Sequence, residues 1–238
     1  MKYKKLIFDL DGTLVSDRES MKYAFCCVLK ELGIAPSMDL ALEWLKYDDA
    51  YWHEIESGRT VFPEYVQTKE DRRVYAQSMR FVLFFESFPM SFEQAIHFND
   101  VYCENLGMHI VPIMGAEELL CFLKENYEIY IATNGPRRSA LKKLENANLS
   151  SYISGVLSSE DAGITKPSKI FFDSLFQMMQ YPHKEEALMI GDGITTDILG
   201  GMQYGIDTCL FNPNNNQIPV DCEPTMSVQS LLELKRKL

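Results

Sequence analysis

Asp9 and Asp11 are two carboxylates held two residues apart, in the run DLDGT at 9–13. The apolar segment 3–8 before them predicts a buried strand, and Gly12 permits the sharp turn with which the chain would leave it. Carboxylates this close raise each other's pKa unless a cation neutralises them. The pair therefore predicts a metal site, or one carboxyl kept protonated as an acid. An ordinary Asx-type turn is the alternative that these five residues leave open.

Two further polar groups are of interest. One lies at the end of the apolar run 128–133, and the other lies in a later loop. The hydroxyl of Thr133, with the backbone N–H groups of Asn134 and Gly135, could hold an anionic oxygen. A plain helix N-cap is the alternative for this turn. Lys166 precedes Pro167 in a loop, where a lysine is usually solvated. Opposite a group of carboxylates, it would become the charge partner of a bound anion.

Asp192 and Asp197 form a second acidic pair, in the run GDGITTD at 191–197. The apolar segment 187–191 predicts the strand that delivers Asp192, and Asp197 falls near the start of the next helix. An Asp there is often only a capping residue. Together with Asp9 and Asp11, however, these carboxylates make a cluster of oxygen ligands, which favours a hard cation such as Mg²⁺.

The elements that would position these residues alternate between strand and helix. Strands are predicted over 128–133, 153–157, 187–191 and 206–211, and helices over 115–126, 136–148, 168–180, 196–204 and 228–238. Alternation of this kind indicates βαβ units and a parallel sheet. Ligands of such sheets gather at the carboxyl ends of the strands. The sequence therefore predicts an α/β fold with a doubly wound parallel sheet.

The segment 15–111 has a different pattern. Apolar residues recur there at spacings of three and four, which predicts helices over 16–32, 37–58, 69–85 and 91–106. A lone first strand packs against nothing, so it must join the later sheet. We therefore expect an all-helical domain at 15–111, inserted into an α/β core formed by 1–14 and 112–238.

Composition excludes several classes of function. The chain of 238 residues carries a formal net charge of −11, and an acidic protein repels nucleic-acid polymers. No apolar stretch approaches the ~18 residues of a membrane span. The 6 cysteines show no C-x-x-C pair and no zinc-like spacing with histidine. These observations predict a reduced, cytoplasmic protein without a membrane or nucleic-acid partner, and they leave its oligomeric state open.

The four motifs occur in the order DLDGT at 9–13, TNG at 133–135, KP at 166–167 and GDGITTD at 191–197. In this order, at strand ends, they resemble the haloacid dehalogenase-like (HAD) hydrolase superfamily, most of whose members are phosphatases. The resemblance implies a Rossmann-like core, and a helical cap domain in the place of the insertion. It covers nearly the whole chain.

The resemblance also implies roles for the motif residues. Asp9 would be the nucleophile that forms an aspartyl-phosphate, and Asp11 would protonate the leaving group and then activate water. Phosphate would be bound by Thr133, Asn134, Gly135 and Lys166. Mg²⁺ would be held by Asp9, the backbone carbonyl of Asp11 and Asp192, and Asp197 would contact the ion's ligands or reach the ion through water. Thr13 either supports Asp11 through a hydrogen bond or only begins the linker to the cap.

Specificity would then come from the cap. Tyr47, Tyr51 and Trp52 offer faces on which a planar ring could stack, and packing in the helical core is the alternative. Trp52 with Glu56 and Gly58 resembles a subgroup of bacterial pyrimidine nucleotidase-like phosphatases, as do 131–135 and 200–205. Tyr47, Trp52 and Glu56 are thus the predicted substrate contacts.

The predicted ligand is a small phosphorylated metabolite, with a nucleoside 5′-monophosphate as the leading substrate. The alternatives are a sugar-phosphate phosphatase, a phosphomutase and a non-catalytic regulator that binds a phosphorylated ligand. Asp11 argues against a dehalogenase, because a departing halide needs no proton.

Overall fold

A computed structural model of the chain describes residues 2–16, 18–56 and 61–238. The chain forms two compact units. The core unit comprises Met1–Asp17 and Ile110–Leu238, and the helical unit comprises Arg18–His109. Each unit has its own hydrophobic clusters. None of the described helices combines the length and apolarity needed to cross a membrane.

The core unit is built on a sheet of 6 parallel strands in the order β5-β4-β1-β6-β7-β8. The strands are β1 Lys5–Phe8, β4 Glu128–Thr133, β5 Gly155–Ser158, β6 Ala187–Gly191, β7 Asp207–Phe211 and β8 Met226–Val228. β1 lies between β4 and β6, so the first strand of the chain is inside the sheet. The predicted union of the first strand with the later ones is confirmed.

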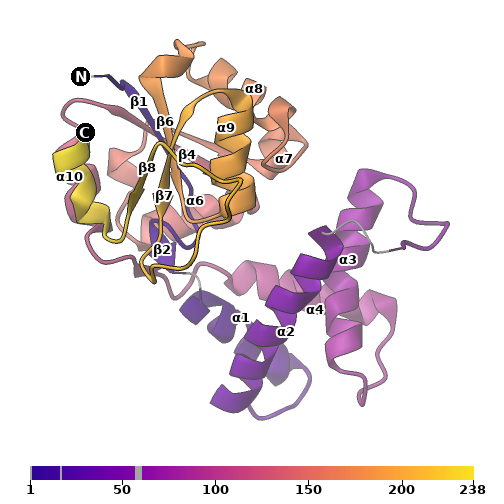
Figure 1. Cartoon of the computed structure of the whole chain (residues 1–238). Helices are drawn as coiled ribbons and strands as arrows, with labels where there is room; N and C mark the ends of the chain where they lie inside the picture. The colour runs from indigo at the N-terminus through magenta and orange to yellow at the C-terminus, as the bar shows by residue number, and fades with distance from the viewer. Residues whose placement is uncertain (1, 17, 57–60) are drawn as a thin grey trace. The chain divides into compact units, whose positions relative to one another are not determined.

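Helices cover both faces of this sheet (Figure 1). Side chains alternate across a strand, so Leu6 and Phe8 enter one hydrophobic cluster while Ile7 enters another. The first cluster is closed by α5 Ala116–Leu123, α6 Arg137–Asn146 and α10 Leu234–Lys237, and the second by α8 Lys169–Met178 and α9 Gly200–Tyr204. The doubly wound, Rossmann-like α/β fold is therefore confirmed.

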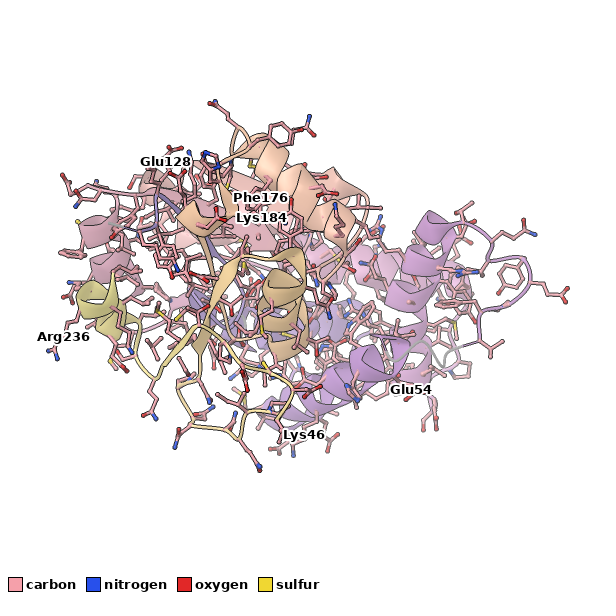
Figure 2. The ribbon with its side chains drawn as sticks, turned by 45° about the horizontal axis from the view of Figure 1, so that its top comes forward. Lys46, Glu54, Glu128, Phe176, Lys184 and Arg236 are labelled. Carbon is pink, nitrogen blue, oxygen red and sulfur yellow. The ribbon has the colours of Figure 1, made fainter. Side chains whose placement is uncertain are left out.

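Tyr204 joins the elements that cover the second face. Its ring lies 5.0 Å from that of Phe176 on α8, and the ammonium of Lys184 lies 4.0 Å from its centroid. Phe176 and Lys184 are both labelled in Figure 2. Lys184 also donates a hydrogen bond to the Tyr204 carbonyl. These contacts fix the end of α9, and α9 follows directly on the turn that carries Asp197.

The helical unit contains α1 Arg18–Glu31, α2 Met38–Glu56, α3 Lys69–Phe84 and α4 Phe92–Asn105. Trp44 is fully buried at its centre, stacked on Phe25 at 4.6 Å and on Phe81 at 4.8 Å between ring centroids. Ser91 and Gln94 form a capping box that starts α4, which satisfies backbone N–H groups that a helix end leaves unpaired.

The end of the chain differs from its prediction. The expected helix over 228–238 is instead β8, a 3₁₀ turn at Leu231–Glu233 and the short α10. Val228 pairs with Phe211 in the sheet, and Ser230 then caps the turn. Pairing with the edge of the sheet thus prevails over the helical spacing of the apolar residues in this segment. A small antiparallel ribbon of β2 Val15–Ser16 and β3 Val111–Pro112 was not predicted, because strands of two residues carry no periodicity.

Candidate active site

The carboxyl ends of three neighbouring strands bring the motifs together. Asp9 follows β1, Thr133 ends β4 and Asp192 follows β6, and β1 pairs with both other strands. Parallel pairing places these strand ends on one edge of the sheet. Lys166 reaches the same edge from the loop before α8, and Asp197 reaches it from the π-helical turn Ile194–Leu199.

Lys166 is the centre of this edge. Its buried Nζ donates hydrogen bonds to Oδ1 of Asp9 at 2.6 Å, to Oδ1 of Asp197 at 2.7 Å and to the carbonyl of Ala132 at 2.7 Å. Burial alone would lower the pKa of this ammonium, but the carboxylates of Asp197 and Asp9 outweigh burial and raise the pKa above its usual value. Lys166 is therefore a fixed positive charge next to Asp9.

Asp9 is a carboxylate with little access to water. Burial raises its pKa well above the usual value, and Lys166 opposes that rise while Asp197 and Asp11 add to it. A carboxylate acts as a nucleophile only when it is ionised. Cations next to Asp9 would therefore favour its ionised form, which the predicted role as a nucleophile requires.

The acidic residues at this edge fit a divalent cation. Asp9, Asp192 and Asp197 can each offer one oxygen atom, and these atoms lie within 4.8 Å of one another. Three carboxylates face one ammonium, which leaves two negative charges for a cation to balance. Oxygen donors are those that Mg²⁺ prefers. Asp197 already accepts hydrogen bonds on both oxygens, from Lys166 and from the Gly193 N–H at 3.0 Å, so Asp9 and Asp192 are better placed as direct ligands.

Two glycines make room for this cluster. Gly12 has φ of +87°, and a Cβ on it would lie 2.4 Å from Oδ2 of Asp192. A Cβ on Gly191 would lie 2.2 Å from Oδ2 of Asp197. Both distances are far below van der Waals contact. Gly12 is therefore required by a carboxylate of the second acidic motif, and Gly191 by a carboxylate of its own motif.

Thr13 has a partner that neither sequence-based alternative named. Its hydroxyl donates to Oδ1 of Asp192 at 2.9 Å and accepts the backbone N–H of Asp192 at 3.0 Å. The expectation that Thr13 supports Asp11 or merely begins a linker is therefore wrong. Thr13 ties the loop after β1 to the loop after β6, and it orients Asp192.

The Thr133-Asn134-Gly135 turn is organised by its own side chains. Oγ1 of Thr133 accepts the N–H of Gly135 at 3.0 Å, which leaves the hydroxyl proton for a bound oxygen. The Asn134 amide pairs with the backbone of Lys166, accepting its N–H at 2.7 Å and donating to its carbonyl at 3.3 Å. Asn134 thus positions the loop of Lys166. The binding of phosphate by this turn stays a prediction.

Lys143 is the residue at this edge that sequence reasoning missed. It belongs to α6, and its Nζ lies 2.5 Å from Oδ1 of Asp11. Its side chain is only 6% exposed, among the buried Ala140 and Leu144 of the same helix and Ala147 directly after it. A lysine in the apolar stripe of a helix was the available signal, since such a position normally takes an apolar residue.

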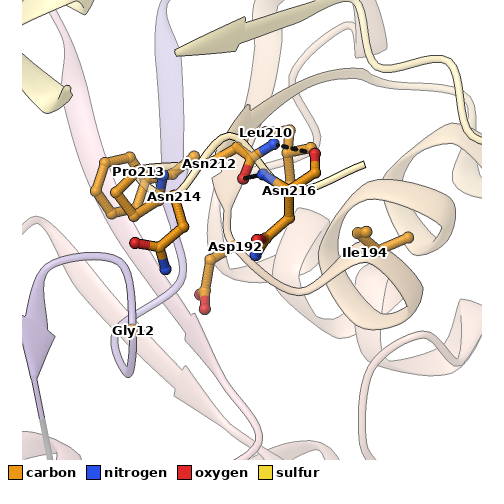
Figure 3. Close-up of a pocket in the computed structure, with 9 residues that line it drawn as sticks. Gly12, Asp192, Ile194, Leu210, Asn212, Pro213, Asn214 and Asn216 are labelled. Atoms are coloured by element: carbon orange, nitrogen blue, oxygen red, sulfur yellow. Dashed lines mark hydrogen bonds between the residues drawn. The ribbon is translucent and has the colours of Figure 1, made fainter. Parts of the chain in front are cut away.

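A cavity of about 230 Å³ opens beside Asp192 (Figure 3). Its lining includes Gly12, Ile194 and the loop 212–216. Asn212 closes that loop, because its side chain donates to the Asn216 carbonyl at 2.8 Å and accepts the Asn216 N–H at 2.9 Å. The predicted metal ligand Asp192 is thus next to a space lined by both polar and apolar residues.

Two of the predicted substrate contacts, Tyr47 and Trp52, pack against other residues of the helical unit. The Tyr47 ring lies 5.2 Å from that of Phe84, and the Trp52 ring lies 5.5 Å from the guanidinium carbon of Arg80. The side chain of Glu56 lies outside the described part of the chain. The two rings help to build the helical unit, and their contact with substrate stays a prediction.

The site thus combines a buried aspartate held by a lysine with further carboxylates, at the carboxyl edge of a doubly wound α/β sheet. The model of the haloacid dehalogenase-like hydrolase family matches residues 3–205. The chain belongs to this family, and the predicted resemblance is confirmed. It is an enzyme of the hydrolase class.

Individual proteins are similar over nearly the full chain. The pyrimidine 5′-nucleotidase PynA of Streptococcus pneumoniae is 30% identical over 235 residues, 98% of this chain and 94% of PynA. The ribulose-1,5-bisphosphate 5-phosphatase of Halopiger xanaduensis is 29% identical over 220 residues, 88% of this chain and 84% of that protein. The crystal structure of the HAD-hydrolase YfnB of Bacillus subtilis, bound to magnesium, has a TM-score of 0.86 at 26% identity, covering 100% of this chain and 99% of YfnB.

Proposed function

We propose that this chain is a Mg²⁺-dependent phosphomonoester hydrolase with Asp9 as its nucleophile. The observation that carries the proposal is the pair of aspartates after β1, each held by its own lysine. Asp9 is bound by Lys166 at 2.6 Å and Asp11 by Lys143 at 2.5 Å. Two carboxylates in separate surroundings can take separate roles, one as a nucleophile and one as a proton carrier.

In the first step, an Asp9 oxygen attacks phosphorus and the bond from phosphorus to the ester oxygen breaks. Asp11 gives its proton to the departing oxygen. Lys166 lies next to the attacking carboxylate, and the Thr133 hydroxyl faces the charge that grows on the phosphoryl oxygens. Asp9, Asp192 and the Asp11 carbonyl would hold Mg²⁺, whose positive charge would help to balance the charge on these oxygens.

In the second step, water attacks the aspartyl-phosphate and releases phosphate. Asp11, now ionised, takes a proton from this water and returns to its starting state. Asp9 is restored as a carboxylate next to Lys166. Covalent catalysis of this kind divides one difficult displacement into two easier ones.

Nucleoside 5′-monophosphates are the substrates we propose, with the unit Arg18–His109 as the cap that selects them. The name of PynA, similar along 98% of this chain, supports this choice. The Halopiger relative, a sugar-bisphosphate phosphatase by name, makes sugar phosphates the second candidate. A panel of nucleoside 5′-monophosphates and sugar phosphates, compared by kcat/KM, decides between them, and nucleotide selection is rejected if no nucleotide exceeds the sugar phosphates.

The reaction class is tested with p-nitrophenyl phosphate on the wild type and on Asp9→Asn. We expect turnover that requires Mg²⁺ and stops on chelation, and a loss of at least ~10³-fold in kcat for Asp9→Asn, since no nucleophile remains. Circular dichroism and thermal unfolding check that the variant is folded. Equal rates for the two proteins, or no metal-dependent turnover in the wild type, would overturn the proposal.

A further inference from the structure

Lys143 has no part in the four motifs, yet it is placed at the reaction centre. It reaches Asp11 from the middle of α6, 132 residues away in sequence. The family motifs explain Asp11 and leave Lys143 without a role. A lysine costs free energy to bury, and it is normally buried only where it is paired. Its pairing with Asp11, the proposed proton carrier, indicates a role in the reaction.

We propose that Lys143 is a positioning residue for the proton transfer made by Asp11. This inference rests on the proposed phosphomonoester hydrolase function. Lys143 would hold Oδ1 of Asp11, so that Oδ2 is the oxygen that carries the proton. It would also stabilise the negative charge that Asp11 acquires when it gives that proton to the leaving group.

The geometry supports the first part of this role. Oδ1 of Asp11 is 2.5 Å from Lys143 Nζ. Oδ2 of the same carboxylate faces Gly135, at 3.6 Å from the position that a Cβ on this glycine would take. Gly135 belongs to the turn proposed to bind phosphate. One oxygen is thus anchored to α6, and the other is directed toward the site of the reaction.

Electrostatics supports the second part. The Lys143 side chain is 6% exposed and that of Asp11 27%, so water screens the pair only partly. A charge fixed before the reaction stabilises charge that develops during the reaction without reorganisation. Lys143 therefore matters most when Asp11 must transfer its proton fully. That condition holds for an alkoxide leaving group and not for p-nitrophenolate, which departs without a proton.

The experiment compares Lys143→Met with the wild type on two substrates, an alkyl phosphate and p-nitrophenyl phosphate, at saturating Mg²⁺. The quantity measured is kcat/KM, because it covers the steps up to phosphoryl transfer to Asp9 and excludes the later attack by water. General acid catalysis is worth ~10²–10⁴-fold, so a disturbed acid should cost about tenfold or more of kcat/KM on the alkyl ester. We expect a loss of less than about threefold on the aryl ester, where this catalysis is not used.

Two further variants complete the test. Lys143→Arg keeps the charge and should restore most of the alkyl-ester activity, and it also serves if Lys143→Met does not fold. Lys142→Met removes the neighbouring lysine of the same helix. It should leave the ratio of the kcat/KM values for the two esters as in the wild type. An equal loss on both esters, or no loss on either, overturns the role of Lys143. No Mg²⁺-dependent turnover in the wild type would instead refute the proposed function itself.

Discussion

Gly12 shows how a single missing side chain shapes the site. The carboxylate of Asp192 occupies the space in which any other residue would place its Cβ. The backbone also has a positive φ of +87° there, which costs a residue with a Cβ roughly 1–2 kcal/mol. Two separate constraints thus act on one position, and they can be separated by experiment.

Replacement of Gly12 by alanine should weaken the binding of Mg²⁺ at the active site. The new Cβ would displace Asp192, and loss of a well-held metal ligand typically costs about 10–100-fold in metal affinity or activity. We expect the Mg²⁺ concentration for half-maximal activity to rise by at least about tenfold, as measured by titration of activity with Mg²⁺.

Gly163→Ala is the matched control for this change. Gly163 also has a positive φ, +67°, but no atom lies within 4 Å of the position of its Cβ. Backbone strain alone should cost Gly163→Ala about as much stability as it costs Gly12→Ala. The Mg²⁺ dependence of its activity should be that of the wild type. If Gly12→Ala has the same Mg²⁺ dependence as Gly163→Ala, Asp192 does not hold the metal.

Sequence could place the acidic residues of the site better than it could place their partners. Asp9 and Asp192 follow apolar strands, and parallel strands place their ends together, so their proximity was predictable. The bonds of Thr13 to Asp192 and of Lys143 to Asp11 depend on side-chain directions across segments distant in sequence. No local pattern records these directions, although a lysine in an apolar helical stripe does mark Lys143 as unusual.

Among the elements, α3 begins with a charged capping box. Thr68 Oγ1 accepts the N–H of Asp71 at 3.0 Å, and the Asp71 carboxylate accepts the N–H of Thr68 at 3.1 Å. These hydrogen bonds lower the pKa of the exposed Asp71. The folded state therefore binds fewer protons than the unfolded state between the two pKa values, so acid removes the contribution of Asp71 to stability.

Asp71→Asn should therefore destabilise the protein at neutral pH and have less effect in acid. The contribution of the carboxylate is complete above the unfolded pKa of about 3.9 and is lost as the pH falls through the lower folded pKa. Urea midpoints of the variant and the wild type, at pH values near 7 and near 3, measure the difference. Gln94→Ala breaks the neutral capping box of α4, and its effect should not vary with pH in this way. A constant difference for Asp71→Asn would contradict the role of its charge.

The elements themselves were predictable where they are long. Helices such as α3 and α4 show their period over several turns, and the central strands are continuous apolar runs. β8 was missed because its 3 residues follow a loop and precede a helical pattern. Its pairing with β7 is decided by the edge of the sheet, which lies 15 residues or more earlier in the chain.

At the scale of the whole molecule, charge and metal act together. The chain carries a formal net charge of −11, and this total includes a formal surplus of two negative charges concentrated at the site before a cation binds. Such an excess destabilises the compact state by self-repulsion. A cation that binds only the folded chain removes part of that repulsion and stabilises the fold by mass action.

Mg²⁺ should therefore raise the thermal unfolding temperature of the wild type. At a concentration 100-fold above the dissociation constant the gain is about 2.7 kcal/mol in the free energy of unfolding. Any salt screens a protein of this charge, so NaCl at matched ionic strength is the necessary reference, and the shift with Mg²⁺ should exceed the shift with NaCl. Asp192→Asn should lose most of that excess, because it lacks one of the proposed ligands. Equal shifts in unfolding temperature with the two salts would show that Mg²⁺ stabilises the wild type only by screening its charge. The carboxylates at the sheet edge would then not form a Mg²⁺ site.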